Sequence, residues 1–231
     1  MEIGGLQKLT LIDYPGKIAA TVFLTGCNFR CPWCYSSEII LPEKVKNQPK
    51  ISEKEFFKFL KTKQGLLEGV VICGGEPCLD RGLPKFVKKI KKLKYAVKID
   101  TNGSWPEMLG KLINEKLIDY IAMDIKAPKG KYEKIVGRKV NIKNIERSIS
   151  FLKEGKVDYE FRTTVVPKLL RKEDILKIAD WISGAKSYYL QNFLPEKTLD
   201  SKFEKIKPYP QKYLLEIQKA ISPFFEICQI R

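Results

Sequence analysis

The sequence predicts an α/β fold, a partial, open (β/α)6 barrel that is TIM-like but not closed. Short apolar, β-branched runs recur along the chain, and each is followed by a turn and then an amphipathic helix. Such units give parallel strands joined by right-handed crossovers, and six of them are two short of a closed eightfold barrel. An open doubly wound sheet is the competing architecture. In both, ligands collect at the carboxyl ends of the strands.

The expected strands are nearly continuous in hydrophobicity, as buried parallel strands require. They span residues 18–26, 69–75, 95–103, 120–128, 158–167 and 187–195. The opening residues 6–12 are expected to form a small strand that covers one edge of the sheet, and the tail 224–230 one further strand.

Helices are expected between the strands. Ser52 and Glu55 form the pattern of a capping box, and Asn141 can cap the helix that follows it. No Gly-, Ser- or Pro-rich linker divides the chain, so we expect a single domain, 1–231, with a core of about 18–195 and a C-terminal helix and strand at about 208–230. The other predicted helices lie near 83–93, 105–117, 142–152, 172–183 and 209–221.

Composition excludes several classes of protein. The 231 residues are 44% hydrophobic and 30% charged, which disfavours a disordered or fibrous chain. There is no apolar run of about 18 residues and no signal-like start, so we expect a cytoplasmic protein without a membrane span. The formal net charge is 43 − 27 = +16. Lysines in 85–94 surround an apolar helical stripe, which favours solvated helix faces over a nucleic-acid surface.

The chain contains no histidine. An imidazole base, a Ser-His-Asp triad and a His-ligated zinc centre are therefore excluded. Any metal must be held by sulfur, by oxygen or by an outside ligand.

Three of the six cysteines are crowded at the end of the first predicted parallel strand. Cys27, Cys31 and Cys34 have the spacing Cys-x3-Cys-x2-Cys. Three thiolates on one loop can hold three irons of a 4Fe–4S cubane and leave the fourth iron open. The alternative is a zinc knot, which usually brings a second Cys-x2-Cys or a His pair, and neither is present. The remaining cysteines, Cys73, Cys78 and Cys228, are candidates for a fourth zinc ligand, but we expect them to be packing residues.

The cysteine motif resembles that of the radical S-adenosylmethionine (SAM) superfamily. An aromatic residue, Trp33, precedes the last cysteine, and Gly74-Gly75-Glu76-Pro77 follows the second predicted parallel strand. Further stretches resemble the glycyl-radical-enzyme activating branch, above all activators of anaerobic ribonucleoside-triphosphate reductase, which are related to those of pyruvate formate-lyase. These stretches are Leu11-Ile12-Asp13-Tyr14-Pro15-Gly16, Asp100-Thr101-Asn102-Gly103, Met123-Asp124-Ile125-Lys126 and Arg162-Thr163-Thr164-Val165-Val166-Pro167.

The resemblance implies a partial barrel of the radical SAM type, in which Cys27, Cys31 and Cys34 hold a 4Fe–4S cluster and SAM chelates its open iron. Gly74 and Gly75 would let the backbone approach the methionine part of SAM, unless they only form a strand-to-helix turn. The expected cofactor-binding residues are Trp33, Gly74, Gly75, Glu76, Asp100, Asn102, Lys126, Arg162 and Gln191.

These residues carry different expected roles. The carboxylate of Glu76 would accept a hydrogen bond from the ammonium group of the methionine part. Lys126 and Arg162 would meet the cofactor's carboxylate, with a structural ion pair as the alternative for each. Related pyruvate formate-lyase activators carry a histidine near the adenosine, and Gln191 stands in the comparable stretch here.

Asp100 has three open interpretations: it accepts from the ammonium, it shapes a tight turn together with Asn102, or it binds a cation. In the related activators a monovalent cation site uses the positions that match Asp100, Thr101, Met123 and Asp124.

The implied reaction is reductive cleavage of SAM to methionine and a 5′-deoxyadenosyl radical, which removes a hydrogen from a backbone glycine of a partner enzyme. The partners implied are that glycyl-radical enzyme and an acidic flavodoxin or ferredoxin as electron donor. Two alternatives stay open: a radical SAM enzyme acting on a small molecule, similar to 7-carboxy-7-deazaguanine synthase, and a non-enzymatic metal- or nucleic-acid-binding module.

Overall fold

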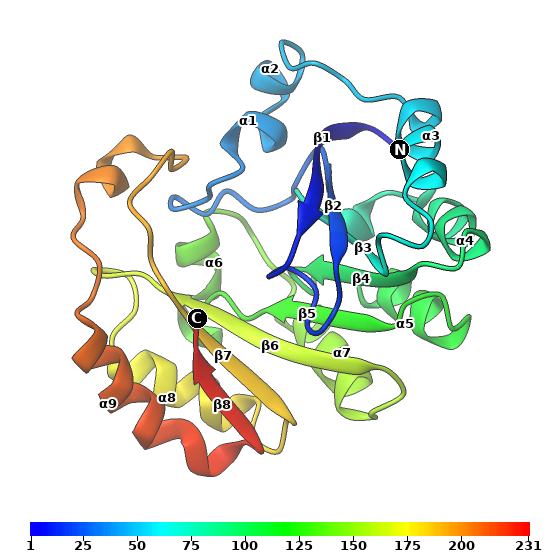
Figure 1. The fold of residues 1–231 in the computed structure, drawn as a ribbon. Coiled ribbons are helices and arrows are strands. Elements are labelled where there is room, and N and C mark those ends of the chain that lie inside the picture. Colours follow the sequence, from blue (N-terminus) through cyan, green and yellow to red (C-terminus); the bar gives the residue numbers. More distant parts are fainter.

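A single sheet of eight strands organises the protein in the computed structural model, which describes all residues, 1–231 (Figure 1). The spatial order of the strands equals their order in the sequence. The first pair is antiparallel and every later pair is parallel. The strands are β1 (Ile3–Thr10), β2 (Ala19–Leu24), β3 (Gly69–Gly74), β4 (Ala96–Thr101), β5 (Tyr120–Asp124), β6 (Asp158–Val165), β7 (Ser187–Asn192) and β8 (Ile227–Ile230).

The sheet curves into an open, partial barrel. Its two outer strands, β1 and β8, do not pair with each other, so one side of the barrel stays unclosed. A doubly wound sheet reverses its strand order at a switch point, whereas this order runs from β1 to β8 without reversal. The sequential order therefore confirms the expected partial barrel and excludes the doubly wound alternative.

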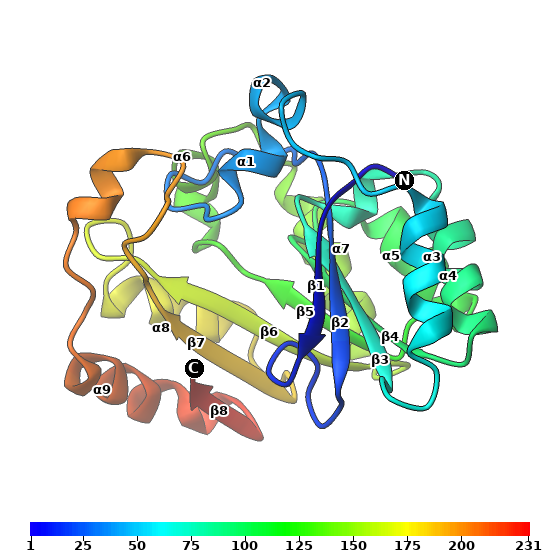
Figure 2. The same cartoon turned by 45° about the horizontal axis from the view of Figure 1, so that its top comes forward.

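The longer helices cover the outer face of the sheet, whereas two short ones after β2 lie beyond the strand ends (Figure 2). A cluster of 52 buried residues fills the space between the sheet and these helices. The helices are α1 (Ser37–Ile40), α2 (Pro42–Val45), α3 (Glu53–Thr62), α4 (Leu83–Lys92), α5 (Pro106–Asn114), α6 (Tyr132–Val136), α7 (Ile142–Lys153), α8 (Lys172–Trp181) and α9 (Gln211–Ile221), with 3-10 turns at Pro77–Leu79, Lys129–Lys131, Ser201–Lys205 and Ser222–Phe224.

Local signals placed the long helices correctly. The Ser52 hydroxyl accepts from the Glu55 amide at 3.2 Å, and the Glu55 carboxylate accepts from the Ser52 amide at 2.8 Å, which is the predicted capping box. Asn141 caps α7 as expected. The strands are shorter than predicted, because their last residues leave the sheet to form the site. Three short helices, α1, α2 and α6, were not predicted. No helix is both long and apolar enough to cross a bilayer.

A second, smaller cluster closes the barrel at the amino ends of its parallel strands. The buried ring of Tyr14 lies in the hairpin turn between β1 and β2 and packs with Ala19 and Val71. Its centroid is 6.1 Å from that of Tyr120, the first residue of β5. The interior is therefore blocked at this end and hollow at the opposite one.

Candidate functional site

A cavity of about 360 Å³ lies at the carboxyl ends of the parallel strands. It is lined by residues from the cysteine loop and from strands β2 to β7. This position is the one that parallel α/β folds use for ligands. Of the predicted site residues, the cavity wall includes Cys27, Cys31, Trp33, Cys34, Gly74, Gly75, Glu76, Asp100, Thr101, Asn102, Asp124, Lys126, Arg162 and Gln191.

The cysteine loop begins where β2 ends and is held by the chain's own hydrogen bonds. The guanidinium of Arg30 donates to the carbonyl oxygens of Cys27 and Phe29, at 2.6 and 2.7 Å. The amide of Arg30 donates to the carbonyl of Val136 at 2.8 Å, so α6 supports the loop. The loop is therefore ordered by its own backbone and by a helix more than 100 residues away.

The three thiols of this loop face the same cavity. Burial raises the pKa of Cys27 to about 11 and that of Cys31 to about 12, and it raises the pKa of Cys34 as well. Buried thiols of this kind need metal to hold them as thiolates at neutral pH. No three His, Cys, Asp or Glu side chains converge on one point as ligands of a single metal ion would. Three thiols on one loop in a chain without histidine fit a cubane, where each thiolate binds a different iron, better than a zinc knot.

The remaining cysteines do not complete a metal site. Cys78 is buried beside Thr101, whose hydroxyl lies 3.6 Å from its sulfur, and Cys228 lies on β8 away from the loop. Cys73 does line the cavity, on β3, and burial raises its pKa. Cys78 and Cys228 are thus packing residues as expected, whereas Cys73 faces the ligand space.

The two glycines of the motif are required by the close approach of two strand ends. Gly74 has φ +107°, and a Cβ there would lie 2.6 Å from the backbone nitrogen and oxygen of Leu24. A Cβ at Gly75 would overlap the carbonyl oxygen of Gly26. The amide of Glu76 donates to that same oxygen at 2.8 Å. Because neither glycine has a side chain, the backbone at the end of β3 can lie directly against the backbone at the start of the cysteine loop.

Glu76 is buried and ties β3 to β4. Its carboxylate accepts from the amide of Cys78 at 3.0 Å, the hydroxyl of Thr101 at 2.7 Å and the amide of Asn102 at 2.6 Å. Burial raises the pKa of Glu76 in spite of these three donors. Its expected role toward the methionine ammonium stays a prediction, since the chain itself already supplies three donors.

Asn102 bridges the end of β4 to the cysteine loop. Its amide nitrogen donates to the side-chain oxygen of Asn28 at 2.9 Å, and its own oxygen accepts from the amide of Ser104 at 2.9 Å. This geometry agrees with the turn-shaping interpretation. Asn28 and Ser104 were not singled out from the sequence, although Asn28 directly follows the first cysteine of the motif.

A largely buried network of five charges, in which Lys98 is fully enclosed and the others are partly exposed, crosses the inner face of β4, β5 and β6. Arg162 donates from Nε to Asp124 at 2.9 Å and from a terminal nitrogen to Asp100 at 2.9 Å. The ammonium of Lys126 lies 3.0 Å from Asp124, and that of Lys98 forms an ion pair with Asp100. Asp124 and Arg162 are register partners on β5 and β6, which is why they meet. Lys126 and Arg162 are thus in structural ion pairs, which was the alternative for each, and their binding of the cofactor stays a prediction.

The network sets the protonation state of its members. Burial alone would raise the pKa of Asp124, but Arg162 and Lys126 outweigh it and lower that pKa to about 2. The same carboxylates, Asp100 and Asp124, hold the pKa of Arg162 above its usual value although burial opposes this. Asp124 does the same for Lys126. Asp124, Arg162 and Lys126 therefore stay charged at neutral pH.

Lys98 was missed by sequence reasoning. Its signal is a lysine inside an apolar strand, two residues before Asp100 and so on the same face of β4. Gln191, on β7, lines the cavity as expected. Its amide forms no side-chain hydrogen bond within the chain and is available to a ligand.

One family profile and several known proteins are similar to this chain. The sequence profile of the radical SAM superfamily matches residues 21–182. A Methanocaldococcus jannaschii protein named "putative glycyl-radical enzyme activating enzyme" is 35% identical over 99% of this chain and 95% of its own length. The Aquifex aeolicus 7-carboxy-7-deazaguanine synthase is 34% identical over 66% of this chain and 62% of its own length.

Solved structures share the fold. Streptococcus suis SuiB bound to its precursor peptide SuiA superposes with a TM-score of 0.67 at 15% identity, over 90% of this chain and 47% of that one. A domain of pyruvate-formate lyase-activating enzyme from Bacteroides vulgatus gives a TM-score of 0.55 at 15% identity, over 69% of this chain and 98% of that one.

Proposed function

Because the chain belongs to the radical SAM superfamily, in its glycyl-radical-enzyme activating branch, we propose that Cys27, Cys31 and Cys34 bind a 4Fe–4S cluster and that SAM fills the adjoining cavity. The chain is an enzyme of that class. When bound, the cluster and SAM supply a 5′-deoxyadenosyl radical. The observation that carries the proposal is the convergence of the three thiols and the charged network on one cavity.

The protein's own residues bind and orient the cofactor. The charged network holds three cations and two carboxylates, so it has a net charge of +1 and can accept one carboxylate from SAM. The free amide of Gln191 can hydrogen-bond the nucleoside part. The closed amino end of the barrel, at Tyr14 and Tyr120, keeps bulk water from that side. No step calls for a protein base, in agreement with the absence of histidine.

We propose further that the hydrogen comes from a backbone glycine of a partner enzyme, with anaerobic ribonucleoside-triphosphate reductase as the first candidate. The full-length relative from M. jannaschii supports this branch. The unclosed side of the barrel supports it also, since a peptide loop needs a lateral entrance. The hairpin turn between the edge strand β1 and β2 borders this lateral gap next to the closed amino end, and there Leu11 and Ile12 are 70% and 85% exposed, while the next residue, Asp13, lines the cavity. We place the partner's contact there.

The test uses anaerobically reconstituted protein. Incubation with SAM, a strong reductant and purified reductase should give methionine, 5′-deoxyadenosine and a glycyl doublet in the electron spin resonance spectrum. Ile12→Glu should lower the yield of the doublet while cleavage of SAM without partner is unchanged, and Leu215→Glu, an exposed leucine on α9, is the matched control. SAM cleavage with no doublet from any glycyl-radical enzyme would refute the activating role.

A second candidate is a reaction on a small molecule, favoured by the similarity to 7-carboxy-7-deazaguanine synthase over two thirds of the chain. A deuterium-labelling experiment separates the two. Deuterium that appears in 5′-deoxyadenosine when a deuterated, protein-free metabolite extract is supplied supports the small-molecule reaction. Deuterium that appears there when the partner enzyme carries deuterated glycine supports activation.

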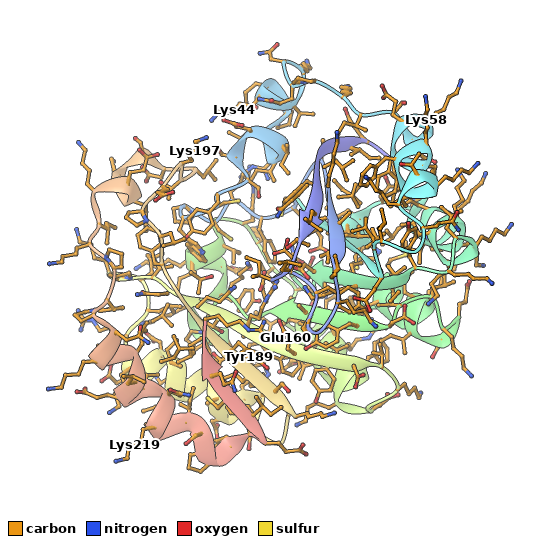
Figure 3. The ribbon with its side chains drawn as sticks, viewed as in Figure 1. Lys44, Lys58, Glu160, Tyr189, Lys197 and Lys219 are labelled. Atoms are coloured by element: carbon orange, nitrogen blue, oxygen red, sulfur yellow. The ribbon has the colours of Figure 1, made fainter.

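We propose an acidic flavodoxin or ferredoxin as electron donor. Lysines project from widely separated elements, including Lys44 on α2, Lys58 on α3, Lys197 after β7 and Lys219 on α9 (Figure 3). The charge therefore covers the surface rather than one patch, and it attracts an acidic partner over long range. The rate of cluster reduction by flavodoxin should fall as salt is raised, whereas reduction by a small neutral reductant should not change.

A further inference from the structure

We propose that Lys98 is a built-in counter-cation, which takes the place of a bound monovalent metal ion beside the SAM site. The inference rests on the proposed function, because it concerns the wall of the SAM cavity. It states that this protein binds its cofactor without potassium or sodium, using an ammonium group supplied by its own strand β4.

The side chain of Lys98 is buried, so its positive charge needs a partner of opposite charge. It is 1% exposed, and its neighbours along β4, Val97 and Ile99, are fully buried. Burying an ammonium is costly unless it is paired, and the structure gives it one carboxylate, Asp100. Asp100 in turn lines the cavity, so the ammonium lies directly behind the cavity wall.

At the four positions expected to form a monovalent cation site, the side chains are already engaged. Asp100 binds Lys98 and Arg162, and Asp124 binds Arg162 and Lys126. The remaining two expected ligands are Thr101, whose hydroxyl donates to Glu76, and Met123, which is fully buried and packs against Gly103. A metal ion would have to share each carboxylate with two internal cations.

Within the network, each carboxylate already has an internal cation. Its three cations and two carboxylates carry +1, so a metal ion bound between Asp100 and Asp124 would add a further positive charge beside Lys98, Lys126 and Arg162. Asp13 and Glu76, which also line the cavity, lie outside this set. An arriving carboxylate, by contrast, makes the network neutral. The residues present therefore do not fit a monovalent cation, and they do fit the anionic end of an amino acid.

The first experiment measures the affinity of the reconstituted wild-type protein for SAM at constant ionic strength in potassium, sodium or choline chloride. Choline is too large for a metal site. We expect dissociation constants for SAM that agree within about twofold in the three salts, because the carboxylates of the network are already paired with internal cations. Binding that is about tenfold or more tighter in potassium or sodium chloride overturns the proposal.

The second experiment uses the cluster-free protein and melting temperature, so it does not depend on the proposed function. Lys98→Ala leaves a hole next to Asp100 that a small cation can enter. We expect potassium chloride at about 100 mM to raise the melting temperature of this variant by roughly 4 °C over choline chloride, and to leave wild type unchanged. Lys58→Ala on the exposed face of α3 is the matched control.

A merely structural lysine would give a lower melting temperature in Lys98→Ala without a selective potassium effect, and that result overturns the proposal. Lys98→Arg keeps the charge and should remain insensitive to the choice of salt. If Lys98→Ala does not fold, the salt comparison on the wild-type protein decides alone. If SAM is never cleaved, the proposed function fails, while the melting comparison still tests the internal cation.

Discussion

Asp124→Asn is the substitution that most directly tests the charged network. It removes the carboxylate that accepts from Arg162 at 2.9 Å and from Lys126 at 3.0 Å, and it leaves both cations in place. Removing one partner of a buried ion pair costs about 3–5 kcal/mol, because the remaining charge loses its compensation. Solvent reaches 24% of the Asp124 side chain, so we expect the lower end, about 3 kcal/mol.

The pH dependence gives an independent check on this value. The pKa of Asp124 falls from its ordinary 3.8 to about 2 in the folded protein, which corresponds to roughly 2 kcal/mol of stability. A lowered folded-state pKa means that this stability is present above pH 3.8 and is lost as the pH falls toward 2. About half of it should have gone by pH 3.

The assay is urea unfolding of wild type and Asp124→Asn at several pH values between 7 and 3. All other titrating groups are shared, so the difference between the two proteins isolates Asp124. Glu107→Gln, which breaks an exposed pair with Arg147, is the matched control and should cost less than about 1 kcal/mol. A variant as stable as this control, with a difference from wild type that does not shrink in acid, would refute the reasoning.

Three further substitutions test separate parts of the site. Gly75→Ala should lower the iron content of the reconstituted protein at least several-fold, because its Cβ overlaps the carbonyl of Gly26, whereas Gly130→Ala, where a Cβ meets no neighbour, should not. Cys34→Ala should abolish SAM cleavage while Cys228→Ala retains it, and equal activity of the two would contradict the ligand assignment. Gln191→Leu should weaken SAM binding by roughly tenfold at unchanged iron content, as expected for one lost hydrogen bond.

Much of the fold could be predicted because its signals are local. The capping box at Ser52 and Glu55 depends on residues three apart, and the structure contains it with both hydrogen bonds. Helix α6 escaped prediction because 132–136 is too short for a periodic pattern. Its position matters nonetheless, since the carbonyl of Val136 holds the cysteine loop.

The site was predicted unevenly for the same reason. The spacing of the three cysteines within one loop is enough to predict them as site residues, and all three line the cavity. Asn28 gave no such signal, because its role depends on a hydrogen bond to Asn102 on another segment. Lys98 gave only a weak signal, a lysine inside an apolar strand two residues before Asp100, and the sharing of that carboxylate with Arg162 of β6 exists only in the folded chain.

Spacing, periodicity and chain order sufficed to determine the succession of strands and helices, the thiol-bearing loop at the end of the second strand, and the exclusion of imidazole chemistry. What tertiary structure alone decided is how the charges at the strand ends pair. Parallel register brings Arg162 beside Asp124, and the curvature of the sheet brings Asp100 to the same guanidinium. Electrostatic pairing depends on distances of a few ångströms between residues up to 62 positions apart, and these exist only once the chain has folded.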